Sequence, residues 1–222
     1  MKLLVALLLG VYILQANEVV NIKNTPVKNL SVLEEKKRFY SLVVPAVQKV
    51  HAELSAKYKR IKKDIGAKKN TQEIKDLKHL YRVTTDEELL LALKPHPVSI
   101  AIAQAAIESA WATSHIFLKA NNLFGVWSVN KNDDRIAAAQ KRKGGRTIWL
   151  RKFKNVEGSI RTYYLTIARV KVYKKLREYR MKTDDVFEII KGLDKYSERG
   201  TKYVDSIGKV IRHNNLTKYD KR

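Results

Sequence analysis

Residues 98–127, VSIAIAQAAIESAWATSHIFLKANNLFGVW, carry the most information about the fold and function of this chain. Apart from His115, Glu108 is the only ionisable side chain between Val98 and Ile116. The small and apolar residues around it predict a short helix packed closely against its neighbours. The positions expected on its buried face are Ile100, Ala103, Ala106 and Ile107.

A carboxylate near the end of such a helix suggests acid chemistry. Burial among apolar groups raises the pKa of a carboxyl, because the charged form loses its solvation. A carboxyl that stays protonated near neutral pH can protonate a glycosidic oxygen. Trp111 would then shield the site from water or stack on a sugar ring. Spacing alone, however, favours a surface Glu108 on the last helical turn with Trp111 in the core.

Helices are expected on both sides of this segment. Ser31 and Glu34 have the form of a capping box, and apolar residues then follow at spacings of three and four up to Leu54. Pro45 lies inside this pattern and predicts a kink or break near Val44. Further helices are expected up to Gly66, from about Thr71, and from Thr84/Thr85 to just before Pro95.

Beyond the central segment the helical periodicity fails between about Asn121 and Phe153. Glycines and asparagines mark turns there, and residues 146–150 alternate like a short strand. Helical patterns resume over 156–180, 184–191 and about 202–212. The expected fold class is mainly α, with a small irregular or β lobe inserted after the central helix.

The N-terminus has the pattern of an export signal. Met1-Lys2 is followed by an unbroken apolar run from Leu3 to Leu14 and a polar shift after Ala16. This run is short for a membrane span, which needs about 20 apolar residues, although an uncleaved anchor is the alternative. The expected organisation is a signal peptide (1–16), a linker with the start of the N-terminal helix (17–35), and one domain (36–222).

Composition limits the kind of partner and cofactor. The net charge of +23 favours polyanions, which for an exported protein are wall glycans with their peptide carboxylates, acidic wall polymers or anionic lipids. No specific nucleic acid is expected, and a solvated basic surface is the plain alternative. The chain has no cysteine, which excludes disulfides and thiolate metal sites. The five histidines show no metal-ligand spacing, so no cofactor or metal is expected.

The pair AQAAIESAWATS (103–114) and ANNLFGVW (120–127) resembles the signature of bacterial peptidoglycan N-acetylglucosaminidases, and most closely their Bax-type branch. Residues 36–45, 151–163 and 196–203 are also similar to that branch. The resemblance extends from about Lys36 to Leu216.

This resemblance implies a lysozyme-like helical fold with the glycan in a groove between the helical body and the lobe. It implies that Glu108 is the catalytic acid and that Tyr203 acts near the scissile bond, although Tyr203 could simply be a packing residue. The residues implied for substrate binding are Trp111, Asn121, Asn122, Phe124, Gly125 and Tyr196.

Two features depart from the expected pattern. The family commonly has glycine where Ala112 stands, so Ala112 is strained if this position needs a positive φ. Most glycosidases also use two carboxylates, but Asp133, Asp134 and Glu157 are equally well explained as solvated loop or helix-start residues. The hypothesis is therefore that the N-acetyl group of the substrate assists Glu108.

The sequence leaves several functions open. An endo-β-N-acetylglucosaminidase is the first, and a muramidase or lytic transglycosylase is the nearest alternative. A non-catalytic basic wall-binding protein is an alternative from another class. The Lys-rich region from Lys57 to Lys78 could contact an anionic wall or lipid surface, although a solvated helix face is the plainer interpretation. The oligomeric state is not indicated by the sequence.

Overall fold

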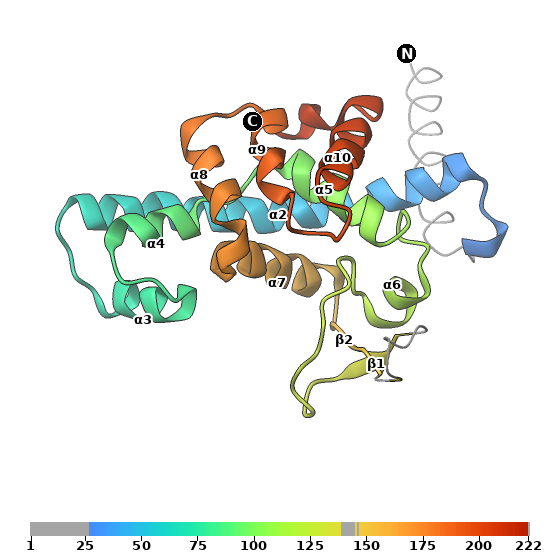
Figure 1. Cartoon of the computed structure of the whole chain (residues 1–222), viewed down its shortest axis with the longest axis horizontal. Helices are drawn as coiled ribbons and strands as arrows, with labels where there is room; N and C mark the ends of the chain where they lie inside the picture. Colours follow the sequence, from blue (N-terminus) through green and yellow to red (C-terminus); the bar gives the residue numbers. More distant parts are fainter. Residues whose placement is uncertain (1–26, 139–144, 146, 222) are drawn as a thin grey trace, which may run out of the picture.

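The computed structural model describes residues 27–138, 145 and 147–221, so the expected signal peptide lies outside the described residues. The helices are α2 (Val32–Gly66), α3 (Gln72–Tyr81), α4 (Asp86–Leu93), α5 (Val98–Glu108), α6 (His115–Ala120), α7 (Val156–Arg169), α8 (Lys174–Lys182), α9 (Val186–Ile189) and α10 (Thr201–His213). The strands are β1 (Arg135–Ala137) and β2 (Trp149–Arg151). The described chain is therefore mainly helical, as expected (Figure 1).

The long helix α2 runs across the whole molecule (Figure 1). It begins with the predicted capping box, in which the side chains and backbones of Ser31 and Glu34 bond reciprocally. The predicted break near Val44 is wrong, because the helix continues through Pro45. Burial of the apolar stripe that includes Val43 and Val47 holds the segment helical despite the hydrogen bond that proline cannot make.

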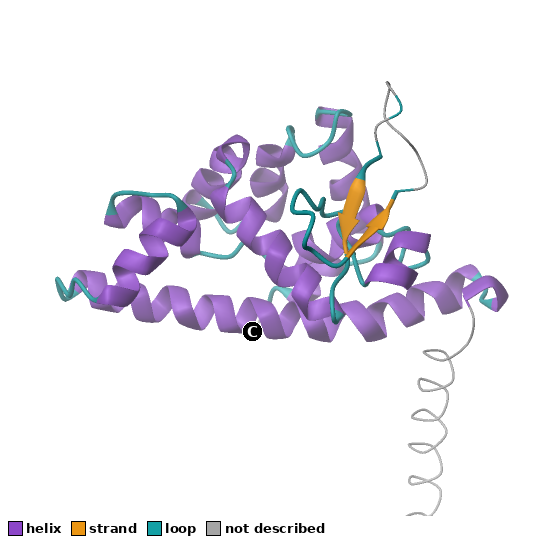
Figure 2. Ribbon diagram, turned by 90° about the horizontal axis from the view of Figure 1, so that it is seen from below, coloured by secondary structure: helices purple, strands orange, loops and turns teal. Residues whose placement is uncertain are grey.

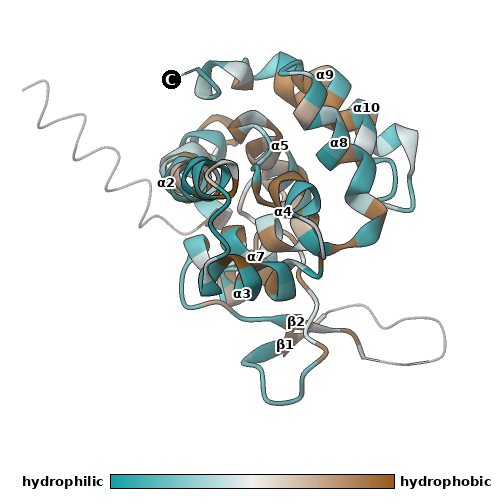
Figure 3. Cartoon of the chain, turned by 90° about the vertical axis from the view of Figure 1, so that its left-hand side faces the viewer, coloured by the Kyte–Doolittle hydropathy of each residue, from teal (hydrophilic) through white to brown (hydrophobic). Residues whose placement is uncertain are grey.

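Helix α5 lies at the centre of the core. It packs between α2 and α10 (Figure 3). Every residue from Val98 to Ala106 is buried, so the expectation of a single buried face was too narrow. A helix that is apolar on all sides belongs inside the protein, and this places Glu108 where the core meets the surface.

The distal half of α2 has a core of its own. Ile61 on α2, Ile74 and Leu77 on α3, and Leu89 and Leu93 on α4 pack together there. Helix α3 begins at the N-cap Thr71 and α4 begins with a capping box between Thr85 and Glu88. Both helix starts were predicted, because caps are local signals.

The lobe between α6 and α7 contains the antiparallel strands β1 and β2, paired through Ile136 and Leu150. It stands beside the helical body (Figure 2). Trp127 forms an isolated bridge with Leu150 that ties the loop after α6 to β2. The strand predicted over residues 146–150 overlaps β2, which begins three residues later, at Trp149, and ends one residue later, at Arg151.

The C-terminal third folds back over α5. The helical structure predicted over 156–180 is present but divided, because α7 ends at Arg169 and a 3-10 turn (Lys171–Tyr173) precedes α8. Arg177 on α8 donates hydrogen bonds to the carbonyls of Ile167 and Val170, and these bonds stabilise the turn. Helix α10 then packs on α5.

Within the described residues no single helix has the length and apolar character needed to cross a membrane. Helices α4 and α5 together satisfy length and composition, but they are bent by 60° at the break between them.

Candidate active site

Glu108 is the last residue of α5 and is partly buried. Burial raises the pKa of its carboxyl above 4.5, and this effect exceeds the opposing influence of a hydrogen bond from Tyr203 and of the charge on Arg199. A raised pKa keeps the proton on a carboxyl closer to neutral pH, as a general acid requires.

Tyr203 lies on α10 and reaches Glu108 across 95 residues of sequence. Its hydroxyl donates a hydrogen bond of 2.6 Å to Glu108 Oε1. The Tyr203 side chain is only 2% exposed, and burial raises its pKa far above the ordinary tyrosine value, with the neighbouring Glu108 adding to the effect. Tyr203 is therefore neutral and acts as a hydrogen-bond donor to the carboxyl.

A buried chain of hydrogen bonds lies behind Tyr203. Gln104, one turn before Glu108 on α5, donates from Nε2 to the Tyr203 hydroxyl at 3.1 Å. Gln104 Oε1 accepts from the Tyr163 hydroxyl at 2.5 Å. The Tyr163 oxygen also lies 2.8 Å from His96 Nε2. His96 and Gln104 are completely buried.

The hydrogen bonds in this buried network are all donated in one direction, from His96 toward Glu108. Tyr163 has one hydroxyl hydrogen and gives it to Gln104, so His96 must be the donor on Nε2. Burial lowers the pKa of His96 well below the ordinary histidine value, which agrees with a neutral ring. Because Gln104 presents an N–H to Tyr203, the hydrogen of Tyr203 is directed at Glu108 Oε1.

The proton that Glu108 would donate is consequently confined to one oxygen. Oε1 already accepts from Tyr203. Within the described part of the chain, no hydrogen bond to Oε2 occurs. The acidic proton of the carboxyl therefore belongs on Oε2.

A groove of about 720 Å³ opens beside Glu108, where the lobe meets the helical body. The lobe and its connections contribute Phe124 to Trp127, Ala138, Ile148 and Leu150, and the helical body contributes Glu108, Tyr163, Thr166, Tyr173 and Tyr196. The Trp127 side chain is 52% exposed. A partly apolar groove with an aromatic wall and one carboxyl suits a sugar polymer.

The predicted substrate residues separate into two groups. Phe124, Gly125 and Tyr196 line the groove. Phe124 stacks on Tyr163 with ring centroids 4.0 Å apart, and Tyr196 stacks on Tyr203 at 5.4 Å. Gly125 has φ +63°, a conformation that favours glycine, and a Cβ there would meet nothing within 4 Å. Backbone conformation rather than space therefore explains this glycine.

Asn121 and Asn122 hold the lobe rather than line the groove. The Asn122 side chain donates to the carbonyls of Val126 and Arg151 and accepts from the Val126 N–H. The Asn121 side chain donates to the Phe153 carbonyl at 3.0 Å. Both asparagines thereby fix the lobe where it leaves and rejoins the helical body.

Trp111 lies away from the groove-lining residues. Its ring packs edge-on against Phe39 at 5.1 Å and Tyr40 at 5.9 Å on α2, and the Lys36 ammonium lies 4.8 Å from its centre. The interpretation of Trp111 as a packing residue fits this position, whereas contact with a sugar in the groove does not.

The turn that follows Glu108 stores backbone strain. Ala110, Trp111 and Ala112 have φ values of +49°, +57° and +62°, in the left-handed region that costs non-glycine residues about 1–2 kcal/mol each. The Ser109 hydroxyl accepts from the Ala112 N–H, and Arg38 donates to the Ala112 carbonyl at 2.9 Å. The position where the related sequences commonly have glycine does require a positive φ.

The candidates for a second carboxylate are engaged elsewhere. Asp133 accepts from Ser128, Asp134 pairs with Lys152, and Glu157 pairs with Lys49. Among the described residues, Glu108 is the only carboxylate that lines the groove. The described residues also contain no group of acidic or histidine side chains that could hold a metal ion.

Sequence reasoning missed the residues behind Glu108. Gln104 was visible as a polar residue four positions before Glu108 in an apolar helix, and a buried polar side chain needs partners. Nothing in the local sequence named Tyr163 or His96 as those partners. Trp127 and Tyr173 in the groove were not singled out either.

The comparisons with known proteins agree with this geometry. The sequence model of the glucosaminidase family, described as mannosyl-glycoprotein endo-beta-N-acetylglucosaminidase, matches residues 88–216. This is more than half of the chain and includes Glu108, Tyr203 and the lobe. No curated protein matches the sequence.

Two solved structures show the same fold. The catalytic domain of the autolysin Auto from Listeria monocytogenes matches with a TM-score of 0.54 at 16% identity, covering 93% of this chain and 97% of that one. A peptidoglycan hydrolase mutant from Sphingomonas sp. A1 matches with a TM-score of 0.50 at 17% identity, covering 82% and 96%. At these identities the likeness concerns the fold alone.

Proposed function

The chain belongs to the glucosaminidase family, and from this and the geometry of its groove we propose that it is an exported endo-β-N-acetylglucosaminidase that cleaves peptidoglycan glycan strands with Glu108 as general acid. The observation that carries the proposal is the Glu108 carboxyl in the wall of the groove, with a raised pKa and one oxygen held by Tyr203. The name of one similar structure, a peptidoglycan hydrolase from Sphingomonas sp. A1, supports peptidoglycan as the substrate.

In the proposed reaction Glu108 protonates the glycosidic oxygen from Oε2 as the bond to C1 breaks. Tyr203 holds Oε1 and stabilises the carboxylate that remains, because a hydrogen bond from a neutral hydroxyl favours the ionised form. Tyr203 then acts through Glu108, as a positioning residue, rather than by touching the substrate acetamido group.

The nucleophile is supplied by the substrate in this proposal. The acetamido oxygen at position 2 of the sugar attacks C1 and forms a cyclic intermediate, which water opens with Glu108 now acting as base. The support for this step is that no second carboxylate among the described residues lines the groove. Demonstrating inversion at the anomeric carbon would exclude it.

The same observation favours a second candidate. A lysozyme-like fold with one carboxylate in its groove can also perform lytic transglycosylation or muramidase cleavage. The products separate these activities, since a transglycosylase leaves anhydro-muramyl ends, a muramidase leaves reducing N-acetylmuramic acid and a glucosaminidase leaves reducing N-acetylglucosamine.

The test is digestion of purified peptidoglycan by residues 17–222, wild type beside Glu108→Gln, with mass spectrometry of borohydride-reduced fragments. The proposal expects reduced N-acetylglucosamine ends from the wild type and a rate lower by about 10²–10⁴ for the variant, the usual contribution of a general acid. Binding by both proteins without any cleavage would instead establish a basic wall-binding protein.

Export is proposed from the N-terminal sequence, which lies outside the described residues. Fusion of residues 1–30 to a reporter that is active only outside the cytoplasm tests it. A silent reporter would refute export.

A further inference from the structure

A second concave site adjoins the groove along α7. It has a volume of about 770 Å³ and lies between the end of α3, helix α4, helix α7 and the start of α8. Thr166 lines both this site and the groove beside Glu108. On β2, Leu150 lines the groove and the next residue, Arg151, lines the second site. The two sites therefore border one another at Thr166 and at β2.

The lining of this second site is strongly cationic. The cationic side chains are Arg82, Arg151, Arg169, Lys171, Lys174 and Arg177, and the single carboxylate is Glu88. We name this set the basic pocket. The Glu88 carboxylate accepts bonds from the N–H groups of Thr84 and Thr85 and interacts electrostatically with Lys174, so a single negative charge faces six cations.

Four of the cations have no counterion. Arg177 is occupied by two backbone carbonyls, and Lys174 lies 3.8 Å from Glu178. In the described part of the chain, Arg82, Arg151, Arg169 and Lys171 form no ion pair. Elsewhere on the surface carboxylates do pair with basic residues, for example Arg60 with Glu73 and Lys78 with Asp86.

Like charges gathered in a concave site repel one another unless an anion joins them. Because the basic pocket borders the groove, an anionic group carried by the polymer in the groove is within reach of it. Peptidoglycan strands carry peptide stems with several free carboxylates on alternate sugars. Arginine guanidinium groups match carboxylates in geometry and charge.

We propose that the basic pocket binds the carboxylates of a peptide stem carried by the strand in the groove, so that the protein prefers stem-bearing over stripped glycan. This inference rests on the proposed function for the identity of the strand. It is separate from that function, because cleavage of a sugar chain does not itself require contact with a stem.

The test compares two substrates, intact peptidoglycan strands and the same strands stripped of their stems by an amidase. The variant is the triple substitution Arg82→Gln, Arg169→Gln and Lys171→Gln. None of these three side chains makes a hydrogen bond or ion pair within the described residues, so the fold is expected to persist. Cleavage of stripped strands serves as the internal check on folding.

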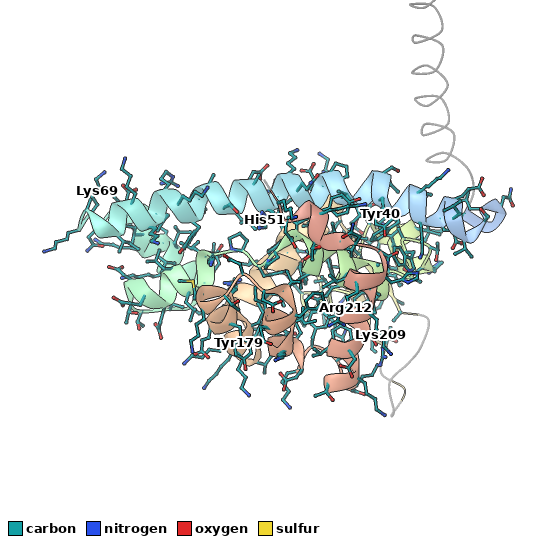
Figure 4. All side chains as sticks on the ribbon, turned by 90° about the horizontal axis from the view of Figure 1, so that it is seen from above. Tyr40, His51, Lys69, Tyr179, Lys209 and Arg212 are labelled. Carbon is teal, nitrogen blue, oxygen red and sulfur yellow. The ribbon has the colours of Figure 1, made fainter. Side chains whose placement is uncertain are left out.

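The matched control removes the same charge far from the groove, through Lys63→Gln, Lys68→Gln and Lys75→Gln. These lysines are exposed near the distal end of α2 and on α3. The neighbouring Lys69 points outward from that end in Figure 4.

The pocket variant is expected to lose about tenfold in kcat/KM on stem-bearing strands, from the sum of three weak ionic contacts, and nothing on stripped strands. The control variant should lose less than about twofold on either. Equal losses on both substrates, or equal losses for the two triple variants, would overturn the inference in favour of general attraction by the net charge.

Binding is measured alongside by co-sedimentation, with Glu108→Gln as the background. This result separates the two proposals if no strand is cut. Loss of binding to stem-bearing strands in the pocket variant supports the inference even then, and unchanged binding overturns it. Tighter binding to poly(glycerol phosphate) than to stem-bearing strands would also overturn it, because the site would then be one for phosphodiesters.

Discussion

Glu108→Gln should stabilise the protein at neutral pH while it lowers the rate of cleavage by about 10²–10⁴. The substitution keeps the size and shape of the side chain and leaves an oxygen that accepts the Tyr203 hydroxyl bond. It removes only the ability of the group to ionise in a site where burial opposes ionisation. The carboxyl that a general acid needs is therefore a source of instability in the folded protein.

The sign follows from the direction of the pKa shift. The folded-state pKa of Glu108 lies above 4.5, so the folded protein holds this proton more tightly than the unfolded chain does. The stability contributed by the protonated group is fully present below about pH 4.5 and is lost as pH rises through the folded pKa. Glutamine has no such loss.

The size of the stability difference between the variant and the wild type scales with the pKa shift of Glu108. Each unit by which the folded pKa exceeds the unfolded value corresponds to about 1.4 kcal/mol in the free energy of unfolding. The advantage of the variant over the wild type should therefore grow from about pH 4.5 upward and become constant above the folded pKa. The final size of this advantage depends on how far burial raises the pKa of Glu108 against the opposing effects of the Tyr203 hydrogen bond and the charge on Arg199.

The assay is urea denaturation of both proteins between pH 4 and pH 8. Glu198→Gln, at an exposed position on the loop before α10, corrects for the removal of one negative charge from the surface. A difference in the free energy of unfolding that does not change with pH would refute the reasoning, because Glu108 would then ionise as easily in the folded protein as in the unfolded chain.

Three further predictions concern the surroundings of Glu108. Tyr203→Phe should move the alkaline limb of the pH–rate profile upward, since the lost hydroxyl no longer lowers the pKa of Glu108; a downward shift would contradict this role. Ala112→Gly should raise the free energy of unfolding by up to about 1 kcal/mol, because relief of left-handed strain exceeds the added chain entropy. As a control, Ala106→Gly, in the helical conformation of α5, should lower the free energy of unfolding by about 0.5–1 kcal/mol. Thermal melts in which both substitutions change stability in the same direction would contradict backbone strain at Ala112. Trp127→Ala should raise KM for glycan strands by about tenfold through loss of an aromatic contact, with kcat nearly unchanged; an unaltered KM would remove Trp127 from the binding surface.

The sequence alone determined the local and strongly patterned features of this protein. The caps at Ser31 and Thr85 were predictable, because a cap bonds to a backbone group within three residues. The central helix ending at Glu108 was predictable from its uninterrupted small and apolar residues. The lobe was predictable from the failure of helical periodicity, although the predicted strand began three residues before β2 does.

Where local signals compete with packing, the sequence alone did not predict the outcome. Pro45 predicts a break, yet the buried apolar stripe keeps α2 continuous. The helical pattern over 156–180 does not mark the turn after α7, which Arg177 stabilises by donating to the carbonyls of Ile167 and Val170. In both places the sum of contacts with residues distant in the sequence exceeds the local preference, and the neighbouring residues do not reveal those contacts.

Only the tertiary structure decided how the site is assembled. It brought Tyr203 to Glu108 across 95 positions, ordered the hydrogen bonds through Gln104, and turned Trp111 toward α2 instead of the groove. A hydrogen bond depends on the position and orientation of two groups to within a fraction of an ångström. Those positions are set by the packing of α5 against α2 and α10, so a chemical partner far away in the chain becomes visible only once the core is formed.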